Sequence, residues 1–381
     1  MNKFNALPFK CPSCGSFMVH KIGTYNLECV SCKTTKAIDA TLHKSNKEPV
    51  DKYNYKTTNP INKEVDCPGC GANVEFIEFE LSKCCPYCKT PLVTTTVNQL
   101  PPNAILPFVI EKKEAKDIFK KWLGSLWFAP NSLSNLLDFE HKFDAVYIPY
   151  FSFDASTYSN YTGARGDAYY VEVVRNVYVN GKMQRVTQME RRIRWSNVSG
   201  SVSRNFLDIL IVAKSDIPET IQKIYSYDLN MLLDYNPSFL SGYKSSEYNI
   251  EMQQCYSMAK DYMKNIIYRD VLWDIGGDEQ KVYNINSRYS NEQFEIVMLP
   301  MWISNFDYKG KKYFITVNGV NGEIIGDRPY SYVKIFFLVA TIILILSALF
   351  YFSDKFDNSG GVNYETNHYQ RQYIPKTQFP Y

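Results

Sequence analysis

Histidine is scarce in this chain, and two common motifs of phosphate-binding and hydrolytic enzymes are absent. Only four of its 381 residues are histidines, and none of them is spaced with a nucleophile or a metal-ligand partner. The sequence contains neither the GxxxxGK[ST] loop that cradles phosphate in ATPases and helicases nor the GxSxG elbow of serine hydrolases. These absences exclude a P-loop motor, and we predict that the protein is not an enzyme.

Arginine is also missing from the whole N-terminal region, because the first arginine of the chain is Arg165. The first 100 residues hold twelve lysines against nine Asp or Glu, and the full chain has a formal net charge of only +3. A region built to grip phosphate is usually more basic and richer in arginine. The composition therefore counts against nucleic acid as a partner without excluding it.

The N-terminus, MNKFNALPFK, lacks the apolar stretch of a targeting signal, and the long apolar run of the chain lies at its other end. Residues 335–352, from Ile335 to Phe352, contain no charge over eighteen positions. At about 1.5 Å per residue this run is roughly 27 Å long as a helix, close to the hydrocarbon thickness of a bilayer. It predicts a single transmembrane helix with a short polar tail at 353–381, the alternative being a buried core helix.

Charge and sulfur chemistry predict the orientation of that helix. The residues upstream of it are basic (Lys309, Lys311, Lys312, Arg328, Lys334), whereas downstream Lys355 is offset by Asp354 and Asp357. The positive-inside rule then places the N-terminal body in the cytoplasm and the tail outside. Unpaired thiols also persist best in a reducing compartment, which agrees with that orientation.

Eight of the ten cysteines form two copies of one spacing pattern. The first copy is Cys11-x2-Cys14 and Cys29-x2-Cys32, and the second is Cys67-x2-Cys70 and Cys85-x2-Cys88. Two CxxC pairs about fourteen residues apart are typical of a zinc ribbon, in which four thiolates bind one Zn²⁺ ion tetrahedrally. We predict two zinc ions per chain, with disulfides or iron–sulfur ligation as the alternatives.

Two cysteines fall outside this pattern. Cys84 could replace Cys85 as a ligand, although only Cys85 keeps the two-residue spacing to Cys88. Cys255 stands alone on an apolar helical face, where a buried core thiol is expected.

The pattern predicts an α+β protein of several parts. These are a zinc ribbon at 1–40, a polar linker at 41–64, a second ribbon at 65–95, an antiparallel-sheet-rich α+β domain at 100–330, and the C-terminal span. Apolar residues at helical spacing predict helices at 111–122 and 252–268, and aromatic runs predict strands at 146–153 and 169–179. Turns are expected at 180–181, 309–310 and 318–319. Because the linker is polar, we expect each ribbon to unfold separately.

The main domain contains a weak internal repeat. AKDIFKKW at residue 115 resembles AKDYMKNI at residue 259, and each is followed by a proline-containing aromatic strand, YIPYF at residue 147 and MLPMW at residue 298. This repeat predicts two helix-plus-antiparallel-sheet units packed together, unless the two helices share residue types by chance.

Two charged clusters have more than one interpretation. Carboxylates surround a Gly-Gly turn at 274–279, where a divalent cation or simply a solvated turn is expected. The run at 191–195 alternates like a strand, with Arg192 and Arg194 on one face and Ile193 and Trp195 on the other. That face is either solvated or docks on anionic lipid or an acidic partner.

The chain resembles a family of bacterial membrane proteins with tandem zinc ribbons and one C-terminal span. The residues that carry the resemblance are the CPxCG knuckles at Cys11 and Cys67, the run from Lys121 to Pro130, YTGARG at 161–166, DIGGDEQ at 274–280, LPMW at 299–302, YKGKKY at 308–313, VNG at 317–319 and GDRPYS at 326–331. Members often carry a name borrowed from the primosomal replication helicase, which finds no motor motif in this chain. Some relatives are encoded beside homologues of phage-shock protein A, so the resemblance implies a membrane anchor that recruits such proteins under envelope stress.

The functional hypothesis is therefore a membrane-anchored adaptor, in contact with membrane lipid, that recruits protein partners to the cytoplasmic face. A membrane-tethered nucleic-acid binder is the alternative, and an enzyme whose site leaves no motif is a third interpretation.

Overall fold

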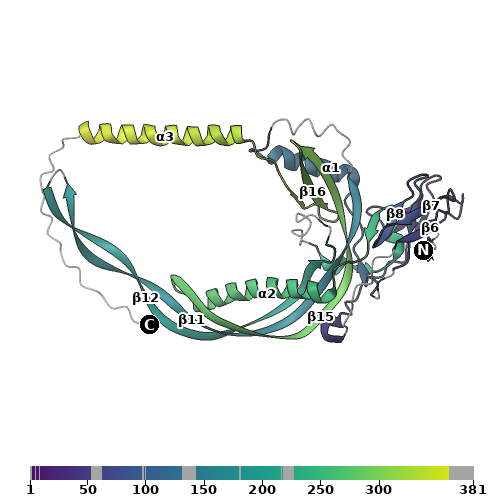
Figure 1. The fold of residues 1–381 in the computed structure, drawn as a ribbon, viewed down its shortest axis with the longest axis horizontal. Helices are drawn as coiled ribbons and strands as arrows, with labels where there is room; N and C mark the ends of the chain where they lie inside the picture. Colours follow the sequence, from purple (N-terminus) through teal and green to yellow (C-terminus); the bar gives the residue numbers. More distant parts are fainter. Residues whose placement is uncertain are drawn as a thin grey trace, which may run out of the picture. The chain divides into compact units, whose positions relative to one another are not determined.

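A computed structural model describes residues 2–4, 6–7, 9–52, 62–96, 98, 100–130, 143–179, 182–215, 217 and 227–359. The chain divides into two compact units. We call residues 1–126 with 132–328 the sheet unit, and residues 127–131 with 329–381 the span unit. The predicted α+β class is confirmed, with two four-cysteine groups near the N-terminus, a sheet-rich body and one apolar C-terminal helix. Figure 1 shows the strands of the sheet-rich body and the C-terminal helix as ribbons.

The sheet unit contains two helices, seventeen strands and three short 3-10 turns among its described residues. In chain order they are β1 (Asn2–Phe4), β2 (Met18–Lys21), β3 (Asn26–Cys29), β4 (Thr35–Ala37), β5 (Glu48–Pro49), η1 (Val50–Lys52), β6 (Lys63–Asp66), β7 (Asn73–Phe76), β8 (Glu80–Cys84), β9 (Pro91–Val93), β10 (Ala104–Ile105), α1 (Lys112–Ser125), β11 (Asp144–Val179), β12 (Lys182–Val212), η4 (Leu229–Met231), β13 (Leu233–Asp234), η5 (Pro237–Leu240), β14 (Lys244–Ser246), α2 (Met252–Ile275), β15 (Glu279–Tyr308), β16 (Lys311–Asn318) and β17 (Ile324–Gly326).

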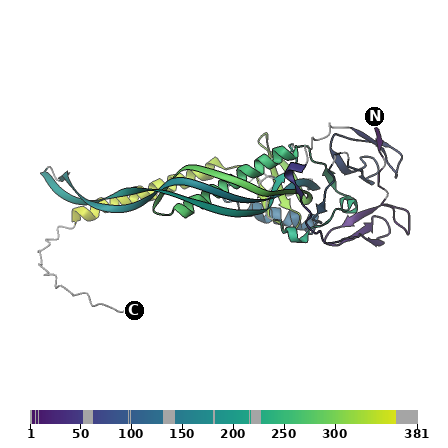
Figure 2. The same ribbon diagram turned by 90° about the horizontal axis from the view of Figure 1, so that it is seen from below.

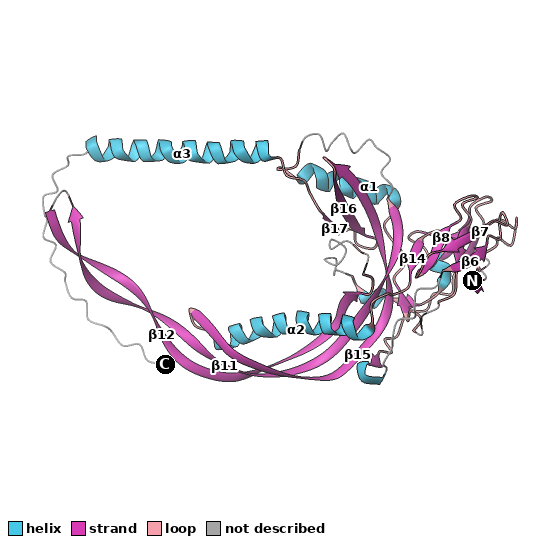
Figure 3. Cartoon of the chain, in the orientation of Figure 1, coloured by secondary structure: helices cyan, strands magenta, loops and turns pink. Residues whose placement is uncertain are grey.

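Three very long antiparallel strands, β11, β12 and β15, dominate the sheet unit (Figure 3). The two strands predicted at 146–153 and 169–179 are one continuous strand, because β12 pairs with β11 all the way from Tyr150 to Val179. Val179 pairs with Lys182, so a two-residue connection joins them, while the predicted turn residues 180–181 themselves lie outside the described residues. The predicted turn at 309–310 is confirmed: Lys309 and Gly310 both have positive φ between β15 and β16.

The two repeats pair with each other around a local pseudo-two-fold. Ile148 of β11 lies opposite Leu299 of β15, and the two prolines, Pro149 and Pro300, occupy equivalent places on either side of that pair. In each repeat, the residue that follows the second strand of the hairpin donates its backbone N–H to the proline carbonyl. Ala213, after β12, donates to Pro149, and Gly319, after β16, donates to Pro300.

The repeats are also intertwined. Strand β10 precedes α1 in the first repeat but pairs in parallel with β15 of the second, at 104–105. Strand β14 precedes α2 in the second repeat but pairs in parallel with β11 of the first, at 244–245. The expected pair of helix-plus-sheet units is therefore present, and each unit contributes a short strand to the central strand of the other.

Helix α2 covers one face of the long strands and forms the main core with them (Figures 1 and 2). The predicted buried face included Cys255, Ala259, Tyr262, Met263 and Ile266, but Tyr262 is exposed. The buried side chains instead recur at four-residue spacing: Cys255, Ala259, Met263, Ile267, Val271 and Ile275. The helix continues past the predicted end at residue 268 because this apolar spacing continues to Ile275. It ends at Gly276 and Gly277, which both have positive φ. Cys255 is a buried core thiol, as expected.

The span unit contains helix α3 (Tyr332–Ser359). Its stretch Tyr332–Phe352 is 21 residues long, has a mean hydropathy of 2.7, and has no share buried inside the structure. A core helix would bury its apolar side chains against the fold, so the prediction of one helix long and apolar enough to span a membrane is confirmed. The tail beyond Ser359 lies outside the described residues.

Candidate metal centres

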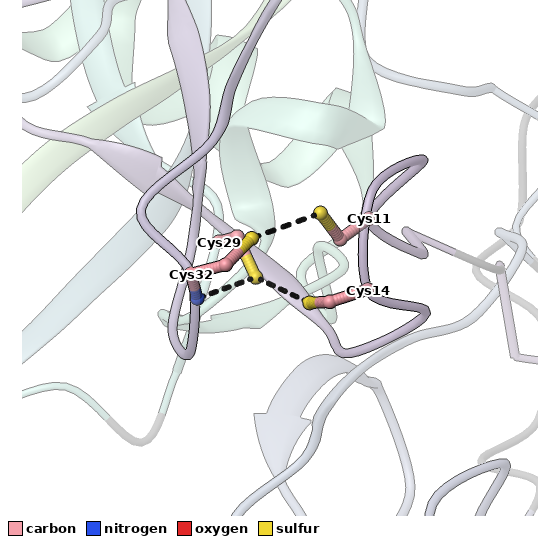
Figure 4. A group of neighbouring side chains, drawn as sticks. All are labelled: Cys11, Cys14, Cys29 and Cys32. Carbon is pink, nitrogen blue, oxygen red and sulfur yellow. Dashed lines mark hydrogen bonds between the residues drawn. The ribbon is translucent and has the colours of Figure 1, made fainter.

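The first candidate metal centre gathers four cysteines from two tight turns (Figure 4). Cys11 and Cys14 lie in the turn closed by the Lys10–Phe17 bridge. Cys29 is the last residue of β3, and Cys32 lies in the turn between β3 and β4. The sulfurs of Cys11 and Cys32 are 3.5 Å apart, and so are those of Cys14 and Cys29.

The second centre repeats the first with the same local backbone. Its sulfurs lie 3.5 Å apart for Cys67 and Cys88 and 3.9 Å apart for Cys70 and Cys85. In each centre the first cysteine accepts from the amide of a glycine four residues later, which is Gly15 in one and Gly71 in the other, with φ of 73° and 74°. A residue with a Cβ is strained at such φ, which explains glycine after both CPxC turns.

Within each centre the four sulfur atoms all lie within 4.8 Å of one another. A tetrahedral zinc ion with Zn–S bonds of about 2.3 Å places its sulfurs roughly 3.8 Å apart, so each of the two groups fits a zinc ion of its own. All ten cysteines lie in the described residues and are free thiols, which excludes disulfides in this structure. The chain therefore has sites for two zinc ions, held by the eight predicted cysteines.

A threonine hydroxyl supports the last cysteine of each centre. Thr34 Oγ1 lies 3.2 Å from Cys32 Sγ, and Thr90 Oγ1 lies 3.1 Å from Cys88 Sγ. These hydroxyls lower the pKa of Cys32 and of Cys88 to about 6, which favours the thiolate that binds metal.

The second cysteine of each centre shows why these groups need a cation. The backbone N–H of Ser16 favours a thiolate at Cys14, but the neighbouring sulfurs of Cys32 and Cys29 outweigh it and raise the pKa of Cys14 to about 12. Four thiolates this close repel one another, and a divalent cation at their centre removes the repulsion. When bound, zinc would be held by four protein ligands, a closed arrangement that is structural and leaves no position for a catalytic water.

The choice between Cys84 and Cys85 is settled by the fold. Cys85 is fully buried in the second centre, whereas Cys84 is outside the four-sulfur group and lines a groove beside it. The two residues are consecutive in the chain at the end of β8, so their side chains point to opposite faces.

Both ribbons dock on one segment of the main domain, residues 237–247. From the first ribbon, the carbonyls of Met18 and His20 accept hydrogen bonds from Ser241 Oγ and Tyr243 Oη. From the second, β8 pairs with β14, and Ser82 Oγ lies 2.6 Å from Ser245 Oγ. The ribbons are therefore fixed to the body of the sheet unit, which sequence reasoning did not anticipate.

The described part of the expected linker also bonds to the body. His43 lies between Asp234 and Glu295, with Nδ1 2.8 Å from Asp234 and Nε2 2.9 Å from Glu295. Lys47 reaches Asp154 and Asp208, and β5 pairs with β15 at residues 293–294. Residues 42–52 thus form a strap across the sheet, although their composition resembles a linker; residues 53–61 lie outside the described residues.

At the end of the same segment, Lys63 forms a deeply buried ion pair. Its ammonium lies 3.0 Å from Glu247, and the two side chains are only 1% and 3% exposed. No sequence signal identifies this pair, because its members are 184 residues apart.

A basic groove of about 770 Å³ lies where the second ribbon meets the sheet. Five lysines from four separate segments line it, against two carboxylates, Glu80 and Asp144; the lysines are Lys83, Lys89, Lys112, Lys214 and Lys244. Its apolar lining includes Val146, Ile148 and Trp302. The groove therefore suits a ligand with negative charge and some apolar surface.

The carboxylates of the 274–279 turn do not converge on a common point. Asp274 accepts from the hydroxyl of Tyr161, Asp278 accepts from the amide of Ala168, and Glu279 pairs with Arg191. Among the described residues, the two cysteine groups are the clusters suited to a metal ion. The turn is thus a structural one that closes α2 onto the long strands.

The arginines of the 191–195 run lie on the outer part of the β11–β12 hairpin. Because β12 pairs with β11 in unbroken register here, Arg192 and Arg194 lie on one face and Ile193 and Trp195 on the other, as expected. Two of the guanidinium groups pair with carboxylates: Arg191 with Glu279, and Arg192 with Glu190.

The chain is similar in sequence to a bacterial protein. The chain is 23% identical over 346 residues to the uncharacterized protein YdjG of Bacillus subtilis (strain 168), and the match covers 86% of this chain and 92% of that protein. No family model and no solved structure match the chain.

Proposed function

We propose that this protein is a membrane-anchored zinc-ribbon adaptor, which holds a binding surface at the cytoplasmic face of the membrane and recruits protein partners there. The observation that carries the proposal is the rigid docking of two structural zinc sites on one sheet, in a chain that ends in an apolar helix which the fold does not bury. Zinc sites of this closed kind shape a surface rather than perform a reaction.

The anchor is supported by the composition of α3 and its flanks. Twenty-one residues of helix extend roughly 31 Å, enough for a bilayer core. The excess of lysine and arginine upstream of the helix and the free thiols of the ribbons both favour a cytoplasmic body with the tail outside.

The basic groove is the surface that we assign to the partner. Its lysines outnumber its carboxylates five to two, and both carboxylates are already paired, Glu80 with Lys83 and Asp144 with Lys244. An acidic segment with an apolar residue complements such a groove. Since the second zinc centre holds the turn that carries Lys89, loss of that zinc would disrupt one wall of the groove. A peripheral membrane-stress protein of the phage-shock protein A type is the partner class that the family resemblance implies.

Affinity purification of the full-length protein from solubilised membranes, with and without nuclease, tests this function. We expect protein partners that survive nuclease and are lost in a K89E/K112E variant. The control K36E/K120E changes the same net charge at exposed lysines outside the groove and should retain the partners. Zinc content of both variants shows that the ribbons are intact.

One outcome would contradict the adaptor, and another would contradict only the groove. Partners that disappear with nuclease would support the alternative, a membrane-tethered nucleic-acid binder. Equal recovery from wild type and K89E/K112E would remove the groove from the proposal.

A further inference from the structure

The span unit joins two segments that are about 200 residues apart in sequence. Residues 127–130 follow α1, yet they are hydrogen-bonded to the start of α3. The backbone N–H of Ser331 donates to the carbonyl of Phe128 at 2.7 Å. The ammonium of Lys334 donates to the carbonyls of Ala129 at 2.8 Å and Trp127 at 3.1 Å. A short loop is thus tied to the first turn of the apolar helix.

This loop and the helix start expose aromatic side chains together. Trp127 is 79% exposed, and its ring stacks on Phe128 with centroids 6.3 Å apart. Tyr332, the first residue of α3, is 84% exposed, and Tyr330 beside it is also exposed. Such large apolar rings are costly to leave in water at one place.

The position of the cluster indicates what covers it. It lies at the end of the apolar stretch that begins at Tyr332, so a bilayer around that stretch has its headgroup region at these residues. Tryptophan and tyrosine are enriched at that depth, because their rings combine an apolar body with a polar group. Lysine there usually extends toward water, but Lys334 instead saturates two carbonyls that would otherwise face lipid.

We propose that Trp127–Pro130 forms a membrane-interface hook, a second contact with the lipid headgroup region that is fastened to the span by Lys334 and Ser331. The inference rests on the proposed membrane anchorage. A lone helix can rotate about its axis, whereas a helix with a loop fastened to one side and inserted in the interface has one preferred orientation. The hook therefore fixes the direction in which the chain leaves the membrane.

Quenching of tryptophan fluorescence by brominated lipids tests the hook. The full-length protein is reconstituted in phosphatidylethanolamine–phosphatidylglycerol vesicles that contain lipids brominated near the headgroup end of the acyl chains. Trp127→Phe should remove most of the quenchable fluorescence. Trp273→Phe is the matched control, since Trp273 is even more exposed, at 87%, but lies on α2 of the sheet unit, and it should remove none.

Lys334→Gln provides a second variant that leaves the aromatic rings in place. It should lower the quenching of Trp127 at least twofold, because the loop loses the ammonium that ties two of its carbonyls to α3. Vesicle flotation is measured on every sample. Protein that floats but shows the same quenching in wild type and Trp127→Phe would overturn the hook and leave the anchor standing. Equal losses in Trp127→Phe and Trp273→Phe would overturn it as well. Wild-type protein that fails to float would overturn the proposed anchorage, and the hook with it.

Discussion

The two ribbons share one zinc frame but are attached to the protein in different ways. Their backbones match turn for turn: in both, the amide of the first cysteine donates to the residue five positions on, and a lysine with positive φ, Lys33 or Lys89, follows the last cysteine. The first ribbon forms its own three-stranded sheet, β2–β3–β4, and touches the body mainly through β2 and η5. In the second, β8 and β9 are strands of the main sheet.

This difference shows that local spacing and coupling to the fold are separate properties. Four cysteines at a given spacing define a metal site wherever they occur, because the turns that carry them need only a few neighbouring residues. How much of the fold is destabilised when that metal is lost depends on which sheet the strands next to the turns belong to. The expectation that the ribbons unfold separately therefore needs revision, most of all for the second ribbon.

The largest effect that we expect is a difference in how much the loss of each zinc ion destabilises the sheet unit. Cys85→Ser and Cys29→Ser should each leave one zinc ion per chain instead of two. Structural zinc contributes on the order of 10 kcal/mol to the folding of a small cysteine domain. Because β8 pairs with β14, Cys85→Ser should destabilise the main sheet as well as the second ribbon. It should therefore lower the melting temperature of the sheet unit more than Cys29→Ser does.

Metal analysis and near-ultraviolet circular dichroism melts of the two variants check this. Cys84→Ser is the matched control, which should keep both zinc ions and the wild-type melting temperature. Equal drops in melting temperature for the two ribbons would mean that sheet pairing does not decide the coupling.

A smaller effect should come from the buried ion pair that ties the second ribbon to the body. Lys63→Met leaves Glu247 buried without its cation, and breaking a buried pair by removing one partner costs about 3–5 kcal/mol. The double variant Lys63→Met with Glu247→Leu should recover much of that loss, because it removes both charges. Urea unfolding of the two single variants and the double variant measures the coupling, and additive losses would refute it.

The strap between the ribbons should make stability depend on pH. Burial alone would lower the pKa of His43, but the hydrogen bonds to Asp234 and Glu295 outweigh it and raise this pKa above the ordinary value. A group whose pKa is raised by folding binds its proton more tightly in the folded state. Its contribution is therefore complete below the unfolded value of about 6.5, and it is lost as the pH rises through the folded value.

His43→Gln should remove this dependence and cost about 1–3 kcal/mol at acidic pH, since Glu295 loses a charged partner while buried. Urea unfolding of wild type and variant between pH 5.5 and pH 8.5, a range of about one to two units on either side of the ordinary value, measures the effect. A difference in stability that is constant across the range, or that grows toward alkaline pH, would contradict the assignment.

The smallest effect should be the same in both ribbons. Thr34→Val and Thr90→Val each remove the hydroxyl beside the last cysteine, and loss of such an outer contact typically weakens metal binding about 10-fold or more. Competition with a zinc chelator should give matching losses for the two variants. A loss confined to one ribbon would show that the shared geometry does not confer a shared affinity.

The sequence by itself determined the features that depend on neighbours in the chain. The eight cysteine ligands follow from the CxxC spacing, helix α2 from apolar residues at helical spacing, and the candidate span from an uncharged run. The boundary errors have the same origin: α2 is longer than predicted, and β11 is one strand instead of two, because partners elsewhere in the fold stabilise residues whose local signal is weak.

Tertiary structure alone decided the features that depend on distant partners. Composition makes residues 41–64 a polar linker, yet His43, Lys47 and Lys63 each find carboxylates more than 100 residues away. The exchange of β10 and β14 between the repeats also depends on distant partners, and so does the docking of both ribbons on residues 237–247. A lysine or a short strand carries no mark of its partner in its own neighbourhood, since the burial that gives such contacts their energy exists only after the chain has folded.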